Sequence, residues 1–198
     1  MIASAIKKRI IRKGRGTVFT PSDFLTMGSR AAVDKTLSRL VKDGTIRRLT
    51  QGVYDYPKVS SRIGPLSPNP DDVAKAIADK DGYVIQVSPA RAANLLGLTT
   101  QVPSKSIYLT NGPTRTKMIG YQVIYMRKAA PKNLVGAGKP TGLIFQALRF
   151  LGKDGVDPHK IQRLSKYLSV ADKKSLAKSL HYPADWMRPI IQKIVTAA

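Results

Sequence analysis

Apolar residues near the start of the chain recur at helical spacing. They predict one helix over residues 2–12 and another that begins at Ser29 and ends near Gly44. Between these two helices lies the sequence Thr20-Pro21-Ser22-Asp23, which is typical of a helix start. Thr20 can cap the helix, Pro21 suits its first position, and Asp23 lies where the helix end is positive. We therefore expect a short middle helix that ends at Gly28.

Two short segments rich in β-branched and aromatic residues follow these helices. Residues 45–49 and 53–56 are predicted strands, and residues 50–52, which include Gly52, suit a bulged hairpin turn. Residues 18–19 are also apolar and predict a short strand or the entry to the middle helix. The resulting order of helix, short helix, tight turn, helix and hairpin is that of a winged helix-turn-helix over residues 1–62.

A change of composition marks the end of this region. Residues 57–70 contain four prolines together with serines and a glycine. This composition is typical of a linker. We therefore predict a domain boundary here and a second domain over residues 66–198.

The second domain has a mixed pattern that becomes helical toward its end. Helices are predicted over residues 70–79, 89–96, 141–151, 158–168, 171–180 and 184–195, and strands over residues 83–87, 106–110, 117–119 and 121–126. The fold class expected for the whole chain is α+β. It combines an N-terminal winged helix-turn-helix with a mixed α/β C-terminal domain that ends in several helices.

The charge of the chain narrows its expected partners. It has 34 Lys and Arg against 12 acidic residues, all of them Asp, for a net charge of +22. A charge of this size attracts polyanions such as nucleic acid or an anionic membrane. No apolar run is long enough to span a bilayer, and the N-terminus has no secretory signal, although residues 1–12 would also suit a basic amphipathic surface helix. We expect a cytoplasmic protein with no membrane partner.

The third predicted helix carries the candidate DNA-binding residues. In a helix-turn-helix, the N-terminal half of this helix enters the major groove. Its apolar stripe leaves polar and basic residues on the open face, and the predicted wing adds two arginines. The candidate DNA-binding residues are Ser29, Arg30, Ala31, Asp34, Lys35, Ser38, Arg39, Lys42, Arg47 and Arg48. Arg and Lys can bind guanine, Ala31 can touch a thymine methyl group, Asp34 can accept from cytosine, and one wing arginine should face outward.

Signatures of catalysis are scarce. The chain has no cysteine, which excludes disulfides and thiolate metal sites, and its two histidines, His159 and His181, lie 22 positions apart. Asp71 and Asp72 suit a helix N-terminus better than a metal site. Residues 136–141 lack the spacing of a phosphate-binding loop, because Pro140 occupies the Ser/Thr position. We predict no enzymatic activity, no cofactor and no metal.

The second domain is basic as well. Four of its tyrosines, Tyr83, Tyr108, Tyr121 and Tyr125, alternate with arginines and lysines. Aromatic side chains among basic ones can bind single-stranded nucleic acid or RNA. The alternative is that the tyrosines belong to the core and the charges are solvated, and the strand pattern favours this alternative.

The residue strings of the first three quarters of the chain are similar to those of the AbiEi-type antitoxins. The resemblance covers about residues 1–150 and weakens beyond them. It lies in Phe19-Thr20-Pro21-Ser22-Asp23-Phe24 and in residues 28–40, 46–49, 52–55, 97–103 and 108–115. It implies an antitoxin of a bacterial type IV toxin–antitoxin system.

Such an antitoxin binds operator repeats through its winged helix and represses its own operon. Its C-terminal domain counteracts a nucleotidyltransferase-like toxin encoded nearby, without a stable complex. Two alternatives remain: a stand-alone winged-helix transcription regulator, and an RNA-binding protein that uses the basic C-terminal domain. A toxin gene beside this one would favour the antitoxin.

Overall fold

The structure, a computed structural model, describes residues 2–197 and is of the mixed α+β class, as predicted. The chain divides into two compact units. The first unit contains the residues up to Tyr83 together with Thr116–Ile124, and the second contains Val84–Arg115 and the residues from Tyr125 onward. Met1 and Ala198, the outermost residues of the two predicted domains, lie outside the described residues.

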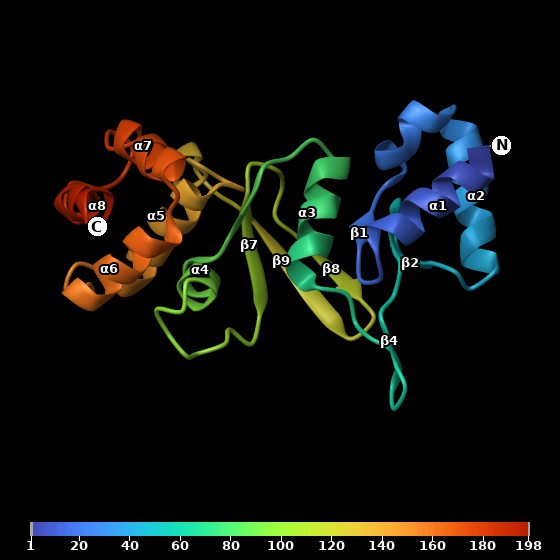
Figure 1. The fold of residues 1–198 in the computed structure, drawn as a ribbon, viewed down its shortest axis with the longest axis horizontal. Helices are drawn as coiled ribbons and strands as arrows, with labels where there is room; N and C mark the ends of the chain where they lie inside the picture. Colours follow the sequence, from blue (N-terminus) through green and yellow to red (C-terminus); the bar gives the residue numbers. More distant parts are fainter. Residues whose placement is uncertain (1, 198) are drawn as a thin grey trace. The chain divides into compact units, whose positions relative to one another are not determined.

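The first unit begins with the predicted order of elements (Figure 1). These are α1 (Ile2–Lys13), β1 (Val18–Phe19), the 3₁₀ helix η1 (Pro21–Met27), α2 (Arg30–Lys42), β2 (Arg47–Thr50) and β3 (Val53–Asp55). Two further strands, β4 (Val59–Ser60) and β5 (Gly64–Pro65), were not predicted, and α3 (Pro70–Lys80) follows them. Helices α1, η1 and α2 pack on one another.

The core of this unit is apolar and aromatic. Ile6 and Ile10 of α1 are one turn apart and fully buried, and they pack with Val33 and Leu37 of α2. The ring of Phe19 packs edge-on against that of Phe24, with centroids 5.5 Å apart. Burying each such side chain contributes about 1.5–3 kcal/mol, so this cluster fixes how α2 lies on the rest of the unit.

Three short strands form the sheet of the first unit, in the order β1-β3-β2, with antiparallel neighbours. The β2–β3 register shifts between Arg48 and Thr50, which is the predicted bulge. Gly52 has a φ of +71°, a conformation that other residues rarely adopt, and this explains the glycine in the turn.

The predicted middle helix is a 3₁₀ helix rather than an α-helix. The Asp23 carboxylate accepts a hydrogen bond from the Thr20 backbone N–H at 2.8 Å and pairs with the Lys13 ammonium at 3.1 Å. Burial alone would raise the pKa of Asp23, but these donors outweigh burial and lower it. At seven residues, η1 is longer than most 3₁₀ helices, and the capping contacts of Asp23 hold its first turn.

Residues 57–83 are folded as part of the first unit rather than forming a linker. They contain the β4–β5 hairpin and α3, whose Val73, Ala74 and Ile77 are buried. Helix α3 contacts β1 and β3, and the Lys80 ammonium donates to the backbone oxygen of Gln51 at 3.1 Å. The boundary between the units therefore follows Tyr83, about twenty residues later than composition suggested.

The second unit combines strands with a helical C-terminal half. From Val84 onward the elements are β6 (Ile85–Val87), α4 (Pro89–Leu95), β7 (Ser106–Thr110), β8 (Arg115–Ile119), β9 (Gln122–Lys128), η2 (Pro131–Asn133), α5 (Pro140–Leu151), α6 (Pro158–Tyr167), α7 (Val170–Lys178) and α8 (Met187–Thr196). The strands pair in the order β6-β7-β9-β8. All of β8 except Arg115, together with the first three residues of β9, is grouped with the first unit.

The C-terminal helices share one apolar core. Phe145 and Leu148 of α5 pack with Leu164 of α6, Leu176 of α7 and Ile191 of α8. Helix α4 lies against α5. These helices begin within three residues of the predicted positions, because Pro140, Asp157 and Ser169 mark their starts.

Candidate nucleic-acid interface

Helix α2 has one buried face and one exposed face. Val33, Leu37 and Leu40 are buried against α1 and η1. Most of the predicted DNA-binding residues lie exposed around the opposite side of the helix or at its start: Ser29, Arg30, Ala31, Lys35, Ser38, Arg39 and Lys42. The packing of α2 thus leaves four cationic side chains in solvent along one helix.

The N-terminus of α2 is held by local hydrogen bonds. The Ser29 hydroxyl accepts from the backbone N–H of Ala32 at 3.4 Å, and the backbone of Ser29 is extended, as a cap residue requires. The Thr36 hydroxyl donates to the backbone oxygen of Ala32 at 2.8 Å. The first turn, where base contacts would be made, is therefore fixed in position.

Asp34 is half-buried and paired. Its carboxylate accepts from the Arg30 guanidinium at 2.8 Å, one helical turn away, and both side chains are about half exposed. Exposed pairs of this kind contribute about 0–1 kcal/mol, so phosphate or a base edge could displace either partner.

Arg47 does not lie on this surface with the others. Its guanidinium donates to both carboxylate oxygens of Asp55, at 3.0 and 2.6 Å, and to the backbone oxygen of Leu66 at 2.7 Å. The Asp55 side chain is 1% exposed, so the pair is closed to solvent on the carboxylate side. We call these three residues the Arg47 joint, because they tie β2, β3 and the segment after β5 together. The predicted role of Arg47 in binding DNA is therefore replaced by a structural one.

Arg48, the next residue, is exposed on β2. One of the two arginines therefore faces outward, as expected from strand alternation. The β2–β3 turn itself is short and is covered on one side by α3, since Lys80 bonds the oxygen of Gln51 and lies against Gly52. This turn offers little surface of its own.

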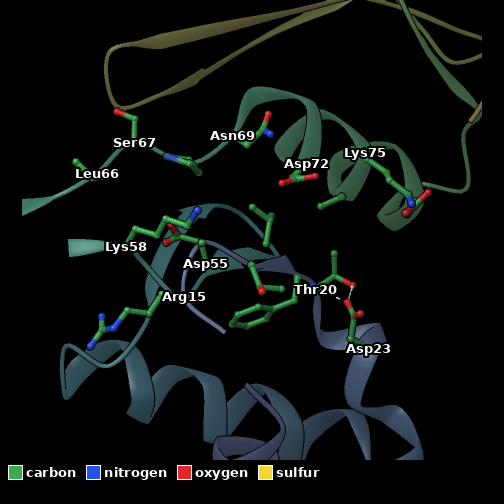
Figure 2. A pocket seen from close by; sticks show the side chains of 17 residues that line it. Arg15, Thr20, Asp23, Asp55, Lys58, Leu66, Ser67, Asn69, Asp72 and Lys75 are labelled. Atoms are coloured by element: carbon green, nitrogen blue, oxygen red, sulfur yellow. Dashed lines mark hydrogen bonds between the residues drawn. The ribbon is translucent and has the colours of Figure 1, made fainter. Parts of the chain in front are cut away.

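A polar hollow lies on another side of the same unit (Figure 2). Its volume is about 610 Å³, and it is lined by β1, by the segment before α3 and by α3 itself. Four aspartates line it, namely Asp23, Asp55, Asp72 and Asp79, with Arg15, Lys58 and Lys75 between them. Acidic and basic side chains nearly balance in this lining, so the hollow lacks the excess of cations that binding to a phosphate backbone requires. In this it differs from the exposed face of α2.

The comparisons with known proteins identify a family, and a distant solved structure is also similar. The family description "Family of unknown function (DUF6088)" matches residues 5–176. The chain belongs to the DUF6088 family. A crystal structure of the RV2827C protein from Mycobacterium tuberculosis is similar, with 16% identity and a TM-score of 0.43, over 98% of this chain and 76% of that one. No curated protein matches the sequence.

His159 and His181 are the histidines considered for catalysis in this DUF6088 chain. His159 and His181 are both exposed, and the ring of His181 lies 3.9 Å from that of Tyr182. Within residues 2–197, no three His, Cys, Asp or Glu side chains lie close enough to hold a metal ion. The loop before α5 packs on itself, because the backbone oxygen of Gly136 accepts from the N–H groups of Lys139 and Gly142.

The second unit of the DUF6088 chain has a large excess of cations. It holds 17 Lys and Arg but only 4 Asp. Asp157 caps α6, where Lys160 lowers its pKa, and Asp172 completes the cap of α7. Asp185 pairs with Arg188 at 3.1 Å. These three carboxylates are occupied near helix starts, and the unit has over four times as many cations as carboxylates.

The tyrosines of the predicted platform differ in exposure. Tyr108 is 3% exposed and belongs to the core, whereas Tyr121 is fully exposed and lies in the segment grouped with the first unit. These two do not share a surface. None of the helices within residues 2–197 has the length and apolar content that crossing a bilayer requires.

Proposed function

We propose that residues 1–62 form a winged helix-turn-helix and that the exposed face of α2 binds the major groove of double-stranded DNA. The observation that carries this proposal is the division of α2 into a buried apolar stripe and an exposed basic face. The element order supports it, since α2 follows a short helix and a tight turn and is followed by the β2–β3 hairpin.

In this proposal each exposed residue has a role that suits its chemistry. Lys35 and Arg39 contact guanine, Ala31 contacts a thymine methyl group, and Ser29 and Ser38 donate to or accept from base edges or phosphate. Lys42 and Arg48 bind phosphates on either side. Asp34 orients Arg30 in the free protein and can accept from cytosine once that pair opens.

The test is binding to the DNA upstream of the protein's own gene, measured by fluorescence anisotropy over a range of salt concentrations. The logarithm of affinity should fall with the logarithm of salt, with a slope of about −0.9 per phosphate neutralised. The double variant Lys35→Ala/Arg39→Ala should lose the preference for this DNA over a scrambled duplex. Binding that does not depend on salt, or equal binding of both duplexes by the unaltered protein, contradicts the proposal.

The biological role that we propose is that of a cytoplasmic autorepressor and antitoxin of a type IV toxin–antitoxin system, acting by binding and without catalysis. This role rests on the sequence similarity to AbiEi-type antitoxins. Its partners are operator repeats and, as a functional antagonist without a stable complex, a nucleotidyltransferase-like toxin. Co-expression with a neighbouring gene of that kind should restore growth, and loss of the protein should raise expression from its own promoter. Repression without growth rescue would favour a stand-alone regulator.

The charge of the second unit favours a further candidate function for that unit, the binding of single-stranded RNA. The unit holds 17 cations against 4 carboxylates, and three of these carboxylates, Asp157, Asp172 and Asp185, already have partners near helix starts. The full-length Lys35→Ala/Arg39→Ala variant should then still bind a single-stranded RNA homopolymer, with a steep dependence on salt. Loss of RNA binding together with specific DNA binding would assign all nucleic-acid contacts to the first unit.

A further inference from the structure

The β4–β5 hairpin is the second hairpin of the first unit and has no counterpart among the sequence predictions. Val59 pairs with Pro65 and Ser60 with Gly64, and the backbone N–H of Leu66 donates to the oxygen of Lys58 at 2.8 Å. In Figure 1 this hairpin extends away from α1, α2 and α3. The tip, residues 61–63, is exposed.

The base of the hairpin is firmly held. On one side the Arg15 guanidinium donates to the backbone oxygen of Pro57 at 3.0 Å and lies over the ring of Tyr56 at 4.7 Å. On the other side the Arg47 guanidinium donates to the oxygen of Leu66. Since Arg47 is itself fixed by Asp55, the hairpin is joined to the same strand pair that follows α2. Its direction is therefore set by the fold of the unit.

The exposed surface of the hairpin is apolar at the tip and cationic beside it. Ile63 is 77% exposed and Val59 is 56% exposed. Lys58 and Arg62 are also exposed, and no acidic residue occurs between Asp55 and Asp71. A large apolar side chain left in water beside cations is characteristic of elements that enter the minor groove of DNA, where the apolar group meets sugars and base edges and the cations meet phosphates. The short β2–β3 turn, bonded to Lys80, offers no comparable group.

We infer that the β4–β5 hairpin is a second DNA-contacting element, in which Ile63 enters the minor groove and Lys58 and Arg62 bind the flanking phosphates. This inference rests on the proposed function of α2 and names the additional contact that the same unit makes. In effect, the hairpin performs the task expected of the wing.

The absence of cysteine allows a direct test on the full chain. Single-cysteine proteins Ser61→Cys and Ser22→Cys are each labelled with an iron chelate that cleaves nearby DNA, and are bound to the upstream duplex. Both positions are exposed, and Ser22 lies in η1, which packs on α2 and has no proposed DNA contact. We expect cleavage from Ser61 at a minor groove outside the region cleaved from Ser22. Cleavage from Ser22 alone overturns the hairpin inference and leaves the function of α2 intact. Cleavage from neither position contradicts the proposed function itself.

Substitutions measure the contribution of each group. Arg62→Ala should reduce the salt slope by about 0.9, the value for one phosphate. Ile63→Ser should weaken binding by about tenfold, which corresponds to loss of one buried apolar side chain, and should leave the salt slope unchanged. Val102→Ser, at an equally exposed position of the second unit, is the matched control and should have no effect. The inference is overturned if the Ile63→Ser protein binds DNA with unchanged affinity but shifts from dimer to monomer in light scattering. Ile63 would then belong to a contact between protein copies.

Discussion

Two groups of cationic side chains in the first unit differ in what holds them. The Arg47 joint is a bidentate pair with a carboxylate that is almost fully buried, closed by a backbone oxygen. The exposed face of α2 holds Lys35, Arg39 and Lys42, which lie in solvent. Both groups look alike in the sequence as basic residues near a predicted helix-turn-helix. A cation that the fold has already paired with a buried carboxylate, as it has Arg47, is not available to an external anion such as phosphate. An exposed cation, such as those of α2, is available.

The largest loss of stability should come from replacing Arg47, the cation of the Arg47 joint. Arg47→Ala leaves the Asp55 carboxylate buried without a partner, which costs about 3–5 kcal/mol. The midpoint of chemical denaturation should fall accordingly, and DNA binding should be lost only when the unit unfolds. Arg48→Ala, one residue further and exposed, is the control and should change stability by less than about 0.5 kcal/mol. A stable Arg47→Ala protein with weakened DNA binding would reverse our assignment.

Substitutions on the exposed face of α2 should weaken DNA binding without changing the stability of the protein. Lys35→Ala should cost about 1–3 kcal/mol on the preferred DNA if Lys35 contacts a base, and should reduce discrimination between DNA sequences. The denaturation midpoint should not change, because the Lys35 side chain is exposed. Lys75→Ala, which removes an exposed lysine beside the aspartates of the hollow, serves as control. Equal losses for both variants would mean that overall charge, rather than the face of α2, determines binding.

The same contrast explains which predictions could be made from the sequence. Helix α2 and its exposed face were predictable, because an apolar stripe at helical spacing determines which side is buried. The Arg47 joint was not, because Arg47 and Leu66 lie 19 positions apart and meet only after the chain folds. Residues 57–70 were misassigned for a related reason. Their prolines are compatible with a hairpin and a helix start as well as with a linker, and packing against β1 and β3 decides between these.

A smaller, pH-dependent effect on stability is expected for Asp23, whose carboxylate accepts hydrogen bonds at the start of η1. The folded-state pKa of Asp23 is lowered, so its stabilisation is present above the unfolded pKa of about 3.9 and is lost as pH falls through the folded value. Asp23→Ala should lower stability by about 1 kcal/mol at pH 7, a typical value for a capping residue. Thermal unfolding from pH 7 down to pH 2.5 should show the two proteins converging at the acid end. A constant difference at all pH values would assign the loss to packing instead.

The smallest effect on DNA affinity is expected for Arg48. This residue adjoins Arg47 in sequence but lies in solvent, so it separates exposure from position along β2. If Arg48 binds one phosphate, Arg48→Ala should reduce the salt slope by about 0.9 and weaken binding about three- to fivefold on every duplex, preferred or scrambled. The ratio of the two affinities should stay constant, since a phosphate carries no sequence information. A change in that ratio would place Arg48 at a base edge. A decrease in the salt slope larger than the value for one phosphate would indicate that β2 shifts its position when the side chain is removed. Anisotropy titrations at four salt concentrations on both duplexes separate these outcomes.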